Sequence, residues 1–282
     1  MLRRRTSGSV VCPSCGALVG VNDERCYTCG RANPGLWGFG PALRQLGSDL
    51  GFVPLVLGAS AVLYLLTLLA SGRNLQIMGG GFNILAPSAP ALLAFGASGG
   101  YPVFQMGSWW TVLSATWLHG SFLHILFNMM WVRQIGPAVA DIYGAGRMVI
   151  IYTISSAMGF LLSSFMGAYL PGIPFIGGGG LTIGASAPIF GLLGALVYYG
   201  RRGGSSMVRS EALGYAVTLF VMGLFLRGVD NAAHAGGFIG GYVAGMWLDP
   251  LKQERVDHLV GAVICLAVTA IAIVVSIVTM VW

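Results

Sequence analysis

Seven long apolar segments follow one another along the chain, and only four of its 24 charged residues lie within them. Most approach the length of about 20 helical residues that crosses a bilayer core. The pattern therefore predicts an all-α polytopic membrane protein. Its spans are expected at about residues 52–70, 121–140, 147–169, 186–200, 208–226, 231–248 and 258–281.

The composition agrees with this pattern, and the positions of the charged residues predict how the chain is oriented in the membrane. The chain is 56% hydrophobic and 9% charged, which excludes an ordinary soluble domain. Met1 to Arg5 lead into a cysteine-rich segment and not into an apolar run, so no cleavable signal peptide is expected. With a cytoplasmic N-terminus, thirteen of the fifteen Lys and Arg residues fall in cytoplasmic segments, and only Arg73 and Arg227 fall outside. The net charge of +6 therefore reflects the orientation of the chain in the membrane and gives no reason to expect nucleic-acid binding.

Residues 1–35 form a predicted unit of their own, ahead of a linker at 36–51. Two Cys-x-x-Cys pairs lie there, and in each pair a glycine follows the second cysteine, which permits a tight turn. Four thiolates at this spacing suit tetrahedral zinc, and disulfides are disfavoured in a reducing cytoplasm. We expect a small cytoplasmic zinc ribbon, with the ligands Cys12, Cys15, Cys26 and Cys29.

The fourth apolar segment is short and begins with Gly184-Ala-Ser186. Pro188 suits only the first turn of a helix, so the helix is expected to begin near Ser186 or Ala187 and to end by Gly200 and the two arginines after it. About 13 residues span roughly 20 Å, less than the bilayer core of about 30 Å. Ser186 is thus expected inside the membrane beside a water-filled cavity. Taken alone, such a serine can equally pack against a neighbouring helix.

The second span carries two histidines and an amide. His124 and Asn128 are four residues apart and share a helix face, where they can serve a site or hydrogen-bond a neighbouring helix. His119 is five residues before His124, so a continuous helix would place it roughly 140° around the axis, facing the first external loop.

The sixth span begins near His234, and Gly237, Gly241 and Gly245 follow at every fourth residue. This stripe of glycines lets another helix approach closely. The fourth span has a matching stripe of small residues that starts at Ala187, so contact between the stripes would bring Ser186 and His234 together.

These residues suggest acyl-transfer chemistry. A serine becomes a useful nucleophile when a neutral histidine takes its proton, so Ser186 and His234 are the predicted pair. The backbone N–H of Ser186 at a helix N-terminus, with His124 and Asn128, can stabilise an oxyanion. Asp230 is expected in an external loop, so a Ser–His dyad is favoured over a triad.

Taken together, the three motifs resemble the rhomboid intramembrane serine proteases over about residues 52–250. The resemblance implies a six-helix core followed by a seventh transmembrane helix in residues 251–282. It implies a dyad of Ser186 and His234, with oxyanion donors from His124, Asn128 and the Ser186 backbone. Phe190 matches the aromatic residue on which the catalytic histidine of that family rests. The supporting residues are His119, Gly184, Phe190, Gly237 and Gly241.

The same resemblance implies an integral protein of a bacterial inner membrane with no cofactor for catalysis, and the distribution of Lys and Arg predicts an external C-terminus. Its partners would be the lipid bilayer and single-span membrane proteins, cleaved near the outer face. Two positions depart from the family pattern. Ala187 and Pro188 follow the serine where glycine is common, and Thr111 follows Trp110 where arginine is usual.

Two other classes of function compete with a protease. One is an inactive rhomboid-like protein that binds transmembrane helices, although such proteins typically lack the serine or the histidine. The other is a transporter that uses His119, His124 and His234. The sequence has no internal repeat and no carboxylate deep in the membrane to couple ions, which disfavours transport.

Overall fold

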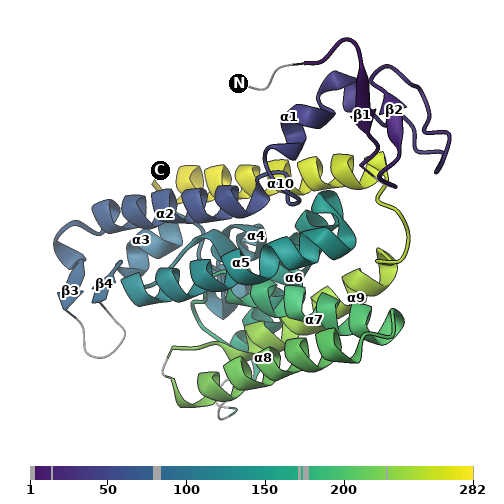
Figure 1. Cartoon of the computed structure of the whole chain (residues 1–282). Coiled ribbons are helices and arrows are strands. Elements are labelled where there is room, and N and C mark those ends of the chain that lie inside the picture. The colour runs from purple at the N-terminus through teal and green to yellow at the C-terminus, as the bar shows by residue number, and fades with distance from the viewer. Residues whose placement is uncertain are drawn as a thin grey trace.

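The structure is a computed structural model that describes residues 4–13, 15–78, 84–170, 173, 178–226 and 228–281. Within these residues all seven predicted spans are helices (Figure 1). Their ends lie within a few residues of the predicted ones. They are α2 (Phe52–Ser71), α5 (Phe122–Tyr143), α6 (Ala145–Tyr169), α7 (Ser186–Arg202), α8 (Ser206–Phe225), α9 (Asn231–Trp247) and α10 (Val256–Val281).

Four of the described helices, α2, α6, α8 and α10, are long and apolar enough to cross a membrane. The other three, α5, α7 and α9, carry the predicted site residues, and α7 is the most buried of them. The chain is thus an integral membrane protein with six core helices and a seventh at its C-terminal end. Part of the predicted glycine-rich approach to α7 (176–177), Arg227 and Trp282 lie outside the described residues.

Short elements fill the remaining connections. The N-terminal unit contains an antiparallel pair, β1 (Ser9–Val11) and β2 (Leu18–Gly20), then η1 (Leu36–Gly38) and α1 (Gly40–Arg44). The long connection between α2 and α5 is folded, and within its described residues the part from 91 to 121 is mostly buried or half-buried whereas 72–77 is mostly exposed. It contains η2 (Gly72–Asn74), β3 (Gln76–Met78), β4 (Ile84–Ala86), α3 (Ala89–Ala94), η3 (Tyr101–Gln105), α4 (Thr111–Ser114) and η4 (Ala115–Trp117).

Helix α7 begins at Ser186, as predicted, but it is longer than expected. It has 17 residues, against the 13 predicted, because Gly200 lies inside the helix and does not end it. A Cβ at Gly200 would lie 2.7 Å from the backbone nitrogen of Arg209, so the glycine permits close packing of the start of α8. At 1.5 Å per residue, α7 still spans only about 26 Å, less than the bilayer core of about 30 Å.

The two stripes of small residues on α7 and α9 are in direct contact. A Cβ at Gly237 would lie 2.1 Å from the carbonyl oxygen of Ala187, and a Cβ at Gly241 would lie 1.9 Å from that of Gly191. Real Cβ atoms do not approach so closely, so only glycine fits at both positions. Helix α6 closes the same region, where Gly159 faces both Ala187 and the backbone of α9.

A buried arginine ties together the end of the assembly next to the N-terminal unit. Arg147 is 3% exposed, and its Nη1 donates to the carbonyl oxygens of three residues of the α9–α10 connection at 2.8–2.9 Å. These acceptors are Leu248, Asp249 and Lys252. Arg31 of the N-terminal unit donates to the backbone of Glu254 in the same connection at 3.2 Å. Figure 1 shows the N-terminal unit beside the start of α10. The N-terminal unit and the α9–α10 connection are therefore at one end, as the predicted topology requires.

We expect the α7–α9 contact to dominate stability. Gly241→Ala forces a methyl group into the Gly191 carbonyl and should destabilise the fold by about 1–3 kcal/mol or more. Gly214→Ala on α8 is the matched control, because a Cβ there meets no atom within 4 Å. Thermal unfolding in detergent measures both. Equal melting temperatures for the two variants would contradict the contact described here.

Candidate active site

Ser186 occupies the first position of α7 and is partly exposed, between the buried Ala185 and Ala187. The helix has no side-chain cap at Ala185. The first amide that bonds within the helix is that of Ile189, which donates to Ala185 at 3.0 Å, and Pro188 has no N–H. The N–H groups of Ser186 and Ala187 thus have no acceptor inside the helix, and the helix dipole makes this end favourable for an anion.

His234 lies against α7 from the first turn of α9. Its ring stacks on Phe190, one turn after Ser186, with ring centroids 4.2 Å apart and an angle of 14° between the planes. Its Nδ1 is 3.1 Å from Oδ1 of Asn231. Because an amide oxygen only accepts, this contact places the proton of a neutral His234 on Nδ1. The lone pair of Nε2 is then available to take a proton from elsewhere.

His124 has the opposite arrangement. The backbone N–H of Gly120 donates to His124 Nδ1 at 3.2 Å, so the proton of a neutral ring lies on Nε2. That nitrogen is directed at Gly184, where an added Cβ would lie 2.6 Å from it. Gly184 has φ of +118°, a conformation that favours glycine for a second reason. His124 therefore offers an N–H donor next to the loop that leads into Ser186.

Asn128 and His119 both contact His124, but from different elements. Asn128 is buried on the same face as His124 and donates from Nδ2 to the His124 carbonyl at 2.8 Å, which leaves its second N–H. His119 lies in the loop before the first residue of α5. The predicted angle between His119 and His124 around the helix axis is therefore wrong. The His119 ring packs edge-to-face on His124, with centroids 5.2 Å apart.

Hydrogen bonds between backbone groups fix the loop that precedes Ser186. The N–H of Gly184 donates to the carbonyl of Ala115 in η4 at 3.0 Å. Thr182 and Ser98 exchange two backbone hydrogen bonds, at 2.7 and 3.1 Å. The position of Ser186 therefore depends on the folded connection between α2 and α5.

Sequence reasoning missed Asn231 as the partner of His234. The available signal was its spacing, because residues three apart share a helix face. Asp230 caps α9 by accepting from the N–H of Ala233 at 2.9 Å, and its other oxygen bonds Ser163 of α6. This carboxylate thus joins α6 to the start of α9, and the dyad remains a prediction.

The two departures from the expected motif have structural consequences. Ala187 is fully buried, and its carbonyl is the atom that Gly237 approaches, so its methyl group fills the interface beside Gly159. Thr111 is 1% exposed, and its hydroxyl donates to the carbonyl of Ser108 at 2.7 Å and to the Ser98 hydroxyl at 3.3 Å. Neither change removes a group from the neighbourhood of Ser186.

The four cysteines of the N-terminal unit form one cluster. Their Sγ atoms all lie within 4.8 Å of one another, with Cys12 to Cys29 at 3.7 Å and Cys15 to Cys26 at 3.6 Å. Tetrahedral zinc with bonds of about 2.3 Å requires sulfurs about 3.8 Å apart. The cluster can hold a metal ion.

Comparison with known proteins agrees with this geometry. The model of the rhomboid domain matches residues 106–250. The chain is 31% identical over 197 residues to rhomboid protease GluP of Bacillus subtilis, covering 68% of this chain and 36% of that protein. It is 33% identical over 176 residues to RHOMBOID-like protein 5 of Arabidopsis thaliana, covering 58% and 52% of the two chains.

A third relative is rhomboid protease GlpG of Pectobacterium atrosepticum, which is 34% identical over 161 residues, or 55% of this chain and 52% of that protein. The chain therefore spans between about a third and a half of the length of these relatives. The matched region contains Ser186, His234, His124 and Asn128, with the helices that carry them. The chain belongs to the rhomboid family.

Proposed function

We propose that the protein is an intramembrane serine endopeptidase that cleaves single-span membrane proteins with a dyad of Ser186 and His234. The observation that carries the proposal is the setting of His234. It is stacked on Phe190 of the helix that begins with Ser186, and Asn231 holds its Nδ1. This leaves Nε2 as the basic atom of a histidine packed against the nucleophile's own helix.

In the proposed reaction, Ser186 Oγ attacks the carbonyl carbon of the scissile peptide bond while its proton passes to His234 Nε2. The C–N bond then breaks, and the leaving amine takes the proton from His234. Water hydrolyses the resulting acyl-enzyme, with His234 again acting as base. Asn231 keeps the imidazole in one tautomer and orientation through both steps.

The oxyanion formed on attack has donors on two sides. The N–H groups at the start of α7 point toward the serine end of the helix, and His124 presents Nε2–H beside Gly184. Asn128 has one N–H that its bond to the His124 carbonyl does not use. Such preorganised donors are worth most in a site shielded from bulk water.

The proposed topology puts the N-terminal unit and the α9–α10 connection in the cytoplasm and Ser186 near the outer face of the membrane. The excess of Lys and Arg in the segments assigned to the cytoplasm supports this orientation. The domains proposed are a zinc ribbon at 1–35, a linker at 36–51, the protease core at 52–250 and the added helix at 251–282. We place the protein in a bacterial inner membrane. An inactive, helix-binding protein is the alternative.

The first test distinguishes a serine endopeptidase from an inactive, helix-binding protein. A fluorophosphonate probe should label the purified protein at Ser186 and should fail to label Ser186→Ala, because the serine oxygen forms the bond. His234→Ala should also lose labelling, since no base remains. Ser210→Ala, an exposed serine of α8, is the control and should label normally. Equal labelling of wild type and Ser186→Ala would support the alternative.

The second test concerns the oxyanion donors. His124→Ala and Asn128→Ala each remove one donor among several, so cleavage of a transmembrane substrate should slow about 10²–10³-fold, or about 2.7–4 kcal/mol. Because His234 is intact, slow labelling of Ser186 should persist in both variants. His119→Ala should act mainly on stability, since His119 contacts His124 from the loop. If folded His119→Ala lost as much activity as His234→Ala, the assignment of His234 as the sole base would be wrong.

The third test concerns the metal. We expect one zinc per chain, and Cys26→Ser should release it because three thiolates hold zinc less well than four. Residues 10–30 should then unfold, since so small a unit has little core of its own. Metal analysis and proteolysis measure this, with Cys265→Ser of α10 as the control. Loss of labelling at Ser186 on zinc removal would show that the ribbon controls the site.

A further inference from the structure

A small cavity lies between the seventh helix and the core, and the proposed mechanism does not use it. Its walls come from α2, η4, α6 and α10, and include Phe52, Thr116, Trp117, Tyr152, Ser156 and Thr269. The volume open to the centre of a water molecule is about 10 Å³. This is close to the smallest space, about 10–15 Å³, that holds one water.

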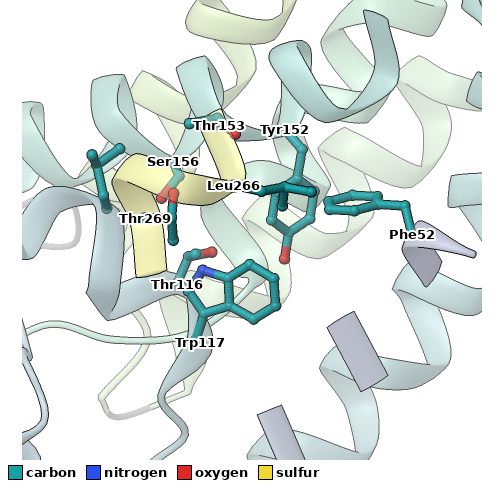
Figure 2. Close-up of a pocket in the computed structure, with 9 residues that line it drawn as sticks. Phe52, Thr116, Trp117, Tyr152, Thr153, Ser156, Leu266 and Thr269 are labelled. Atoms are coloured by element: carbon teal, nitrogen blue, oxygen red, sulfur yellow. The ribbon is translucent and has the colours of Figure 1, made fainter. Parts of the chain in front are cut away.

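Three buried polar atoms border this cavity. Among the described residues, the indole Nε1 of Trp117 and the hydroxyls of Thr116 and Tyr152 make no hydrogen bond of ordinary geometry, although the two hydroxyls lie near enough to interact with each other. In Figure 2 the Tyr152 hydroxyl points toward Trp117 from α6, and the indole nitrogen is turned toward Thr116. An unpaired polar group buried in this way destabilises the folded state, so three around one space require a shared partner.

We propose that this cavity is a binding site for a single ordered water molecule, inside the membrane and closed by α10. Indole N–H can only donate, so the water oxygen accepts from Trp117, and the two hydroxyls complete its hydrogen bonds. Three hydrogen bonds are typical of a buried water. The hydroxyls of Thr153 and Ser156 also face this region, but each already donates to a backbone carbonyl, of Val149 and Val112.

The water site would fix η4, since Thr116 and Trp117 are two of its three residues. The first residue of η4, Ala115, accepts the hydrogen bond from Gly184, two residues before Ser186. Loss of the water would thus loosen the loop that places the nucleophile and slow the labelling of Ser186. This consequence rests on the proposed function, whereas the water site itself does not.

Ultraviolet resonance Raman spectroscopy of the protein in nanodiscs tests the site, because the indole band reports hydrogen bonding at Nε1. The wild type minus Trp117→Phe difference spectrum should show a hydrogen-bonded indole. The same difference taken on a Tyr152→Phe/Thr116→Val background should show a free indole. Thr153→Val, whose hydroxyl is satisfied within α6, is the matched control and should leave the Trp117 band unchanged.

Thermal unfolding gives a second and independent measurement. Removing a hydroxyl that binds the water should lower the melting temperature by about 2–4 °C for each of Tyr152→Phe and Thr116→Val. Removing an unpaired hydroxyl would leave it unchanged or raise it. A free indole at Trp117 in the wild type, or an unchanged or higher melting temperature for Tyr152→Phe, overturns the proposal. Neither measurement depends on protease activity.

Discussion

The close approach of α7 and α9 is the constraint on which the rest of the site depends. Helices that pack through side chains keep their axes about 8–10 Å apart. Here the backbone of α9 meets the carbonyl groups of Ala187 and Gly191 directly, because Gly237 and Gly241 have no side chain. In lipid the hydrophobic effect does not hold helices together, so packing of this kind supplies the attraction. It also brings His234 over Phe190, and hence next to the serine end of α7.

A single hydrogen bond sets the tautomer of each of two histidines near the start of α7. The N–H of Gly120 makes Nδ1 of His124 an acceptor, so its Nε2 is a donor. The amide oxygen of Asn231 makes Nδ1 of His234 a donor, so its Nε2 is an acceptor. In the proposed mechanism the same side chain therefore serves as an oxyanion donor on one helix and as a base on another. Neither role needs a carboxylate, which would be costly to bury in the membrane.

The sequence predicted much of this arrangement because its signals are periodic or local. Spans follow from apolar length, the start of α7 follows from Pro188, and the α7–α9 contact follows from glycines at every fourth residue. The predictions from the sequence failed where the backbone geometry of the folded chain decides the position of a residue or the end of a helix. The angle assigned to His119 assumed a helix that includes it, although the predicted span began after it, as α5 does. Nothing in the spacing shows that Gly200 continues α7 so that α8 can approach. Asn231 was missed because its role depends on one contact, between its amide oxygen and Nδ1 of His234, which the sequence does not show.

The connection between α2 and α5 shows why so much chain is folded on one side of the site. A loop at membrane depth must satisfy every backbone polar group from within the protein. The loop before α7 does this by pairing with Ser98 and with Ala115 of η4. Helix α10 in turn packs on this connection, where Trp110 donates to Ser276 at 3.0 Å. The seventh helix therefore packs on the same connection whose residue Ala115 holds the loop before α7.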